Sequence, residues 1–124
     1  MTTGKIIDLQ DALIDQEVVA FYGEAIATCN KILNQAKIYG FSLMHLPDPN
    51  IHSIVKLFEN IIIPILDGLC KSGDFSPDSG IRIANIKQYT LHLREISLAL
   101  EQGDKNKFSK AVSELQHEPM LFCS

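Results

Sequence analysis

One stretch of the sequence carries a start signal, an apolar stripe and a stop signal for a helix. Ser76-Pro77 combines a side-chain cap with a proline at the first helical position, and Gly103 suits the left-handed residue that follows a helix. Between these ends, apolar side chains recur every three or four residues, which is the helical period. The stretch therefore predicts a long amphipathic helix that buries one face: Ile86, Tyr89, Leu93, Ile96 and Leu100.

A second helix is predicted over residues 16–39. It ends before Gly40, which has the backbone freedom that a helix C-terminus requires, and Gly23 allows a break inside it. The first ten or so residues predict a separate short helical segment. The expected buried residues are Tyr22, Ile26, Cys29, Leu33 and Ala36 in the helix, and Ile6, Leu9 and Leu13 in the short segment.

Two further stretches have the same period. Residues 51–71 contain Pro64, which removes a backbone donor and predicts a kink, and a fourth helix follows the capping residue Asp104 and ends at Pro119. The expected stripes are Ile51, Ile54, Phe58, Ile61, Ile65 and Leu69, widened by Val55 and Ile62, and then Phe108, Ala111, Val112 and Leu115.

These elements predict an all-α fold. Four main helices and a short N-terminal helical segment, joined by short connections, are typical of an antiparallel up-down bundle. The length of 124 residues fits one domain, so we expect a single helical-bundle domain over 1–124. In this bundle we expect the fourth helix to run back toward the end that holds the connection 40–50.

Charge and hydropathy narrow the classes of partner. The net charge is −4 and the pI is near 5.5, without the basic stripe of nucleic-acid-binding domains. The longest apolar run, residues 61–66, is far shorter than the roughly 20 residues that cross a bilayer. The N-terminus has no signal-peptide core, and three separated cysteines form no disulfide framework. We therefore expect a cytoplasmic protein with no nucleic-acid and no membrane partner.

The histidines and acidic residues do not combine into a complete catalytic or metal motif. Glu114 and His117 form one Glu-x-x-His, whereas carboxylate-bridged metal sites in helical bundles use two such motifs and further glutamates. His45 and His52 flank a proline-rich turn without a carboxylate fixed by spacing. The chain also lacks a Gly-x-Ser-x-Gly turn and a glycine-rich phosphate loop. We therefore assign no catalytic residue, no cofactor and no metal ligand.

The hairpin from Leu93 to Leu115 resembles the closing hairpin of histidine-containing phosphotransfer domains. The resemblance rests on Glu95, on the turn Gly103-Asp104 and on the apolar Phe108 and Val112, and it covers about a fifth of the chain. It implies a signalling module with an active histidine that is followed by a lysine-glycine step. Leucine, serine and leucine follow the corresponding candidates here, which are His45, His52 and His92.

The connection from Gly40 to Pro47 is unusually apolar. Connections are normally polar because their backbone needs water. The tail after Pro119 repeats the pattern, and methionine and phenylalanine together form an adaptable contact surface. The candidate contact residues are Phe41, Leu43, Met44, His45, Leu46, Met120, Leu121 and Phe122.

Two interpretations of these apolar segments stand side by side. They cap the core at one end of the bundle, or they bind another protein or a second copy of the chain. The isoleucine-rich middle of the second helix is a further candidate for a dimer face. We predict a small cytosolic, non-enzymatic protein that acts by protein–protein binding, as an adaptor, chaperone, inhibitor or immunity-type regulator. The alternatives are a helical-bundle ligand- or metal-binding protein or enzyme, and a phosphotransfer-like signalling module.

Overall fold

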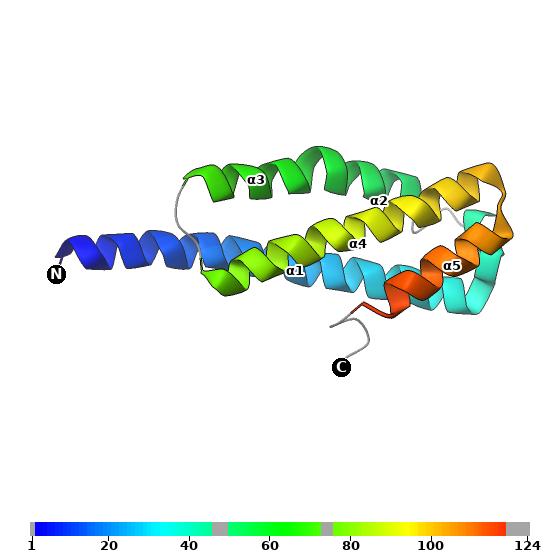
Figure 1. The fold of residues 1–124 in the computed structure, drawn as a ribbon, viewed down its shortest axis with the longest axis horizontal. Coiled ribbons are helices and arrows are strands. Elements are labelled where there is room, and N and C mark those ends of the chain that lie inside the picture. Colours follow the sequence, from blue (N-terminus) through cyan, green and yellow to red (C-terminus); the bar gives the residue numbers. More distant parts are fainter. Residues whose placement is uncertain (1, 46–49, 73–75, 119–124) are drawn as a thin grey trace.

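The computed structural model describes residues 2–45, 50–72 and 76–118, with the side chains of residues 2–13, 44 and 72 left aside. Within these ranges nearly every residue is helical and no residue belongs to a strand (Figure 1). This confirms the predicted all-α class.

The first helix, α1, runs without interruption over Thr2–Tyr39 and has 38 residues. The prediction of a separate short N-terminal segment was therefore wrong, because the sequence around Asp15 contains no residue that breaks a helix. Gly23 lies exposed inside α1 without ending it. The helix ends at Gly40, whose φ of +57° is left-handed as predicted, and a 3₁₀ turn, η1, follows over Gly40–His45.

The second predicted helix is present and contains a π-helical turn. It consists of α2 (Ile51–Leu57), the π turn η2 (Phe58–Ile62) and α3 (Ile63–Ser72). The backbone N–H of Ile63 donates to the carbonyl of Phe58, five residues earlier. The wider turn ends two residues before Pro64, which has no backbone N–H to donate.

The π turn changes which side chains of this helix are buried. We predicted that Ile61 and Ile65 face the core, and this was wrong because both are exposed. The extra residue in the turn rotates the rest of the helix by about one position, so that Ile62 and Leu66 take the buried places. The buried stripe is Ile51, Val55, Phe58, Ile62 and Leu66.

The third predicted helix, α4, spans Pro77–Gln102, and the fourth, α5, spans Lys105–Gln116. The predicted caps are confirmed: the Ser76 hydroxyl accepts from the N–H of Ser79, Gly103 has a φ of +69°, and Asp104 accepts from the N–H of Lys107. All five predicted stripe residues of α4 are buried.

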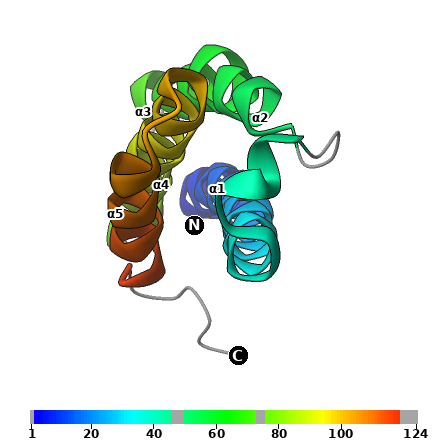
Figure 2. The ribbon, with the colours of Figure 1, turned by 90° about the vertical axis from the view of Figure 1, so that its right-hand side faces the viewer.

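The helix α4 is central to the packing because it contacts α1, α2, α3 and α5. Figure 2 shows α2 and α3 above, α1 to one side, and α4 with α5 to the other side. The helix α1 also contacts α5. Buried side chains from all these helices join one hydrophobic core.

The position of α5 differs from the prediction. The helices α1 and α4 end at the same end of the molecule, so α5 begins beside η1 and runs away from it (Figure 1). The expectation that the fourth helix runs toward the first connection was therefore wrong. At the opposite end, Asp15 of α1 lies against Ser76, and the preceding residues of α1 extend beyond the start of α4.

Candidate functional site

The structure separates the predicted contact residues into different environments. Leu43 is only 2% exposed and belongs to the core, whereas Phe41 is partly exposed and His45 is exposed. The side chain of Met44 and the whole of Leu46 lie outside the described residues. The same holds for the three candidates of the tail, which are Met120, Leu121 and Phe122.

Phe41 connects η1 to the beginning of α5. Its ring meets the Phe108 ring edge to face, with 5.6 Å between the centroids. The Lys105 Nζ lies 5.9 Å from the centroid of the same ring, which is a cation–π distance. The apolar connection therefore folds back onto the bundle through Phe41 and Leu43, and leaves part of the Phe41 ring at the surface.

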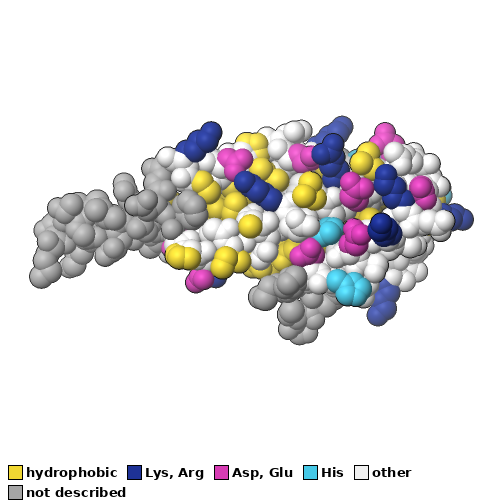
Figure 3. Space-filling view, in the orientation of Figure 1, with side chains coloured by type: hydrophobic (Ala, Val, Ile, Leu, Met, Phe, Trp, Pro, Cys, Tyr) yellow, Lys and Arg dark blue, Asp and Glu magenta, His cyan; other side chains and the backbone are white. Residues whose placement is uncertain are grey.

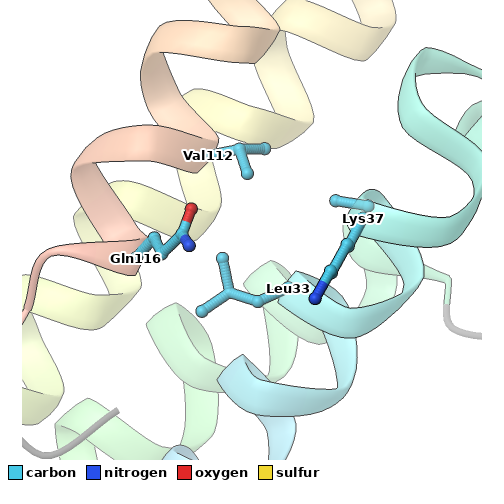
Figure 4. Close-up of a pocket in the computed structure, with 5 residues that line it drawn as sticks. Leu33, Lys37, Val112 and Gln116 are labelled. Atoms are coloured by element: carbon cyan, nitrogen blue, oxygen red, sulfur yellow. The ribbon is translucent and has the colours of Figure 1, made fainter. Parts of the chain in front are cut away.

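A groove runs between the C-terminal half of α1 and α5. It consists of two neighbouring hollows of about 220 and 360 Å³, which share Ala36, Val112 and Gln116. In Figure 4, Leu33 and Lys37 of α1 face Val112 and Gln116 of α5 across the first hollow. We call this feature the α1–α5 groove. Its remaining lining residues are Gly40, Phe41, Lys105, Phe108, Ser109 and Ser113.

The α1–α5 groove has an apolar floor and a basic rim. Leu33, Ala36 and Phe108 are buried beneath it. Among the described residues that line it, the charged ones are two lysines, Lys37 and Lys105, and none is Asp, Glu or His. The groove therefore offers apolar contact with positive charge at its edges.

The sequence pattern did not reveal this groove. Leu33, Ala36 and Val112 follow the helical stripes and were predicted as core residues. The hollow forms because Ala36 and Val112 are short side chains on facing helices, and no pattern within one helix shows which residue of another helix lies opposite. The lysines gave no signal, since exposed lysines are common on helices.

Three of the four histidines, His52, His92 and His117, have polar partners. The His52 Nδ1 and the Ser97 hydroxyl are hydrogen-bonded. The His92 Nε2 donates to a Glu118 carboxylate oxygen at 2.7 Å, and the His117 Nδ1 donates to the Ser113 carbonyl at 2.6 Å. The His52 contact joins α2 to α4, whereas the His92 and His117 contacts are neighbours at the end of α5, because Glu118 follows His117. Within the described residues no three His, Cys, Asp or Glu side chains gather as a metal site would require.

Two further titratable groups lie in the core. Burial raises the pKa of the Cys29 thiol to about 12, so the thiol stays protonated and is a poor nucleophile at neutral pH. Burial also raises the pKa of Tyr89, with a further contribution from its hydrogen bond to Tyr22. Cys29 and Tyr89 therefore act as core residues of the α1–α4 contact.

Two further findings concern membrane-spanning helices in the described part of the chain and the similarity of the chain to known proteins. None of the described helices combines the length and the apolar character that crossing a bilayer requires. No family model, no curated protein and no solved structure matches this chain.

Proposed function

We propose that the chain is a small cytosolic, non-enzymatic protein, an antiparallel up-down bundle in one domain, that acts by binding another protein through the α1–α5 groove. The observation that carries this proposal is the pairing of an apolar floor with a rim whose charged residues are both lysines. An adaptor, chaperone, inhibitor or immunity-type regulator works through such a surface.

The groove favours an amphipathic segment with acidic flanks. The 12 residues of α5 give it a wall of about 18 Å, which accommodates about three turns of a partner helix. Helices dock into such grooves by inserting apolar side chains at helical spacing. Acidic residues beside those anchors would face Lys37 and Lys105, and partly exposed Phe41 would contribute an aromatic contact at one end.

Site-specific photo-crosslinking tests this proposal. A photoreactive amino acid replaces Ser109, which lines the groove, or Asn106, which is exposed on α5 outside it. In cells that express the protein, we expect Ser109 to give a defined crosslinked partner and Asn106 to give none. Equal crosslinking from both positions, or no crosslinking from Ser109, would contradict the proposal.

Charge reversal adds a matched control. The double variant Lys37→Glu and Lys105→Glu should reduce the Ser109 crosslink about tenfold or more, because it removes the attraction to acidic flanks. Lys110→Glu changes an exposed lysine of α5 outside the groove and should leave the crosslink unchanged. Circular dichroism melting verifies that all variants stay folded. An unchanged crosslink in the double variant would exclude the basic rim as a binding determinant.

A further inference from the structure

The described chain ends beside the α1–α5 groove. Gln116, the last residue of α5, lines both hollows of the groove, and His117 and Glu118 complete the described part of the chain. The backbone N–H of Glu118 donates to the Leu115 carbonyl at 3.1 Å, so the chain still lies against the end of α5 at this point. The tail, residues 119–124, therefore begins next to one end of the groove.

A side-chain contact fixes the point at which the tail begins. The His92 Nε2 of α4 lies 2.7 Å from a Glu118 carboxylate oxygen, and these side chains are only 12% and 19% exposed. Away from water such a contact is stronger than at the surface. Figure 3 shows histidine side chains beside acidic ones over the end of α5 and the neighbouring part of α4. Glu118 is thus held by both α4 and α5, and the tail starts from a defined position.

The tail is long enough to lie along the groove. An extended chain advances about 3.3 Å per residue, so the six residues of the tail reach about 20 Å. Back along α5, Val112 is about 9 Å and Lys105 about 20 Å from Glu118, at about 1.5 Å per residue. Pro119 cannot continue the helix, so the sequence allows the chain to turn back at this point. Both hollows are therefore within reach.

The tail has the side chains that the floor of the groove accepts. Met120, Leu121 and Phe122 are consecutive large apolar residues. In water they would form an apolar patch, whereas the groove offers an apolar floor that includes Leu33 and Ala36. Methionine fits irregular hollows well because its side chain is unbranched and flexible. Contact between the tail and the floor therefore removes apolar surface from water on both sides.

The tail offers no charge to the lysines of the groove. Residues 119–124 contain no Asp, Glu, Lys or Arg side chain, so they can cover the floor without forming an ion pair with Lys37 or Lys105. The partner proposed above carries acidic residues that would face both lysines. Such a partner can displace the tail, because it makes an electrostatic contact that the tail lacks.

We propose that the tail lies in the α1–α5 groove of its own chain and covers it until the partner displaces it. The displacement rests on the function proposed above, whereas the covering does not. Because the tail is tethered two residues beyond Gln116, its effective concentration at the groove is on the order of millimolar, and a weak contact suffices. The tail acts as an autoinhibitory cover, since the apparent Kd of the partner rises as the open fraction of the groove falls.

Photo-crosslinking in the purified full-length chain tests where the tail lies. A photoreactive amino acid replaces Ser109, which lines the groove, or Lys110, the next residue of α5, which lines a separate hollow shared with α4. We expect Ser109 to crosslink to the tail at least about tenfold more than Lys110, because a tethered tail stays in the groove. Equal yields from the two positions, or no tail crosslink from Ser109, would overturn the proposal.

Mixing isotope-labelled and unlabelled chains distinguishes a tail that covers its own groove from a tail that covers the groove of a second copy. We expect the Ser109 crosslink to join peptides of the same label, because both belong to one chain. Crosslinked peptides that combine the two labels would show pairing between copies and would overturn the proposal.

Substitutions in the tail test whether its apolar side chains make the contact. The double variant Leu121→Gln and Phe122→Gln should reduce the Ser109–tail crosslink about tenfold or more, because it removes apolar contact without adding charge. The double variant Cys123→Gln and Ser124→Gln places the same side chains later in the tail and should leave the crosslink unchanged. Circular dichroism melting verifies that both variants are folded. Equal losses in both variants would contradict an apolar contact with the floor.

Crosslinking in cells tests the autoinhibitory role. The Leu121→Gln and Phe122→Gln variant should raise the yield of the partner crosslink from Ser109 about threefold or more, because its groove is open. An unchanged or lower yield would overturn this role. The tail crosslink needs no partner, so the two proposals fail separately. A tail crosslink in the purified chain without any partner in cells contradicts the proposed function alone, and a partner in cells without a tail crosslink overturns the tail contact alone.

Discussion

At the scale of single residues, Asp15 forms a polar contact of three hydrogen bonds between α1 and the start of α4. Its Oδ1 accepts from the Ser76 hydroxyl at 3.1 Å, from the Ser76 backbone N–H at 3.3 Å and from the Ser79 hydroxyl. Ser79 is fully buried. The carboxylate also lies at the N-terminal end of α4, where the helix dipole favours negative charge.

These contacts make the stability of the fold depend on pH. The hydrogen bond from Ser79, followed by those from Ser76, lowers the pKa of Asp15 below its ordinary value of 3.8. The stabilisation is therefore fully present above pH 3.8 and disappears as the pH falls below it, because the native carboxylate must then be protonated. Asp15→Asn should lower the thermal midpoint at neutral pH. As the pH is lowered into the acid range, the midpoint of this variant should then fall less than that of the wild type.

Thermal melts of both chains from neutral pH to acid measure this effect. Asp67→Asn is the control, since Asp67 forms a half-exposed ion pair with Lys87 that contributes little. If Asp15→Asn and Asp67→Asn change the midpoint equally at every pH, the Asp15 contact does not stabilise the fold.

Single residues also show what the sequence could predict. The caps Ser76 and Asp104 were predictable because the groups they bond lie three residues away. Asp15 was not, because its partners are 61 and 64 residues away in the sequence. Local bonds leave a spacing signature, whereas long-range bonds depend on how the helices come together.

At the scale of elements, two glycines should respond oppositely to alanine. Gly23 is exposed within α1 and an added Cβ meets nothing within 4 Å, so Gly23→Ala should raise the free energy of unfolding by about 0.5–1 kcal/mol. Gly103 has a φ of +69°, so Gly103→Ala should lower it by about 1–2 kcal/mol. Urea denaturation measures both. Changes of the same sign would contradict the helix end at Gly103 or the continuity of α1.

The elements were largely predictable, and the internal details of the second helix were not. Helical spacing and end signals gave the four long helices to within a few residues, apart from the fusion of the N-terminal segment with α1. The π turn at Phe58–Ile62 has no spacing signature of its own. Pro64 lacks the backbone N–H that a regular α-helix requires at this position. Either a kink or a wider turn can accommodate the missing hydrogen bond.

At the scale of the whole molecule, the central position of α4 predicts how strongly its two faces affect stability. Leu93 is buried and Leu91 is 53% exposed on the same helix. Leu93→Ala should lower the free energy of unfolding by about 2–5 kcal/mol, because it removes core contacts and leaves a cavity. Leu91→Ala should change it by less than about 0.5 kcal/mol. Equal losses in urea denaturation would show that α4 is not buried as described.

The helix order and the all-α class followed from the sequence, but the position of the candidate site did not. The apolar connection drew attention to Phe41, which does line the α1–α5 groove. The other wall of the groove is α5, and its relation to α1 depends on long-range packing. The exposure of Ile61 and Ile65 was likewise hidden, because both isoleucines fit a buried stripe until the π turn is known.

The contact between α1 and α4 also gives the protein an intrinsic optical signal. The chain has three tyrosines and no tryptophan. Tyr22 of α1 and Tyr89 of α4 lie with their ring centroids 6.4 Å apart and their planes 25° apart. We expect these two neighbouring rings to dominate the near-ultraviolet circular dichroism, and the exposed Tyr39 to contribute little. Separation of α1 from α4 can therefore be followed in the unlabelled protein, independently of the loss of helix.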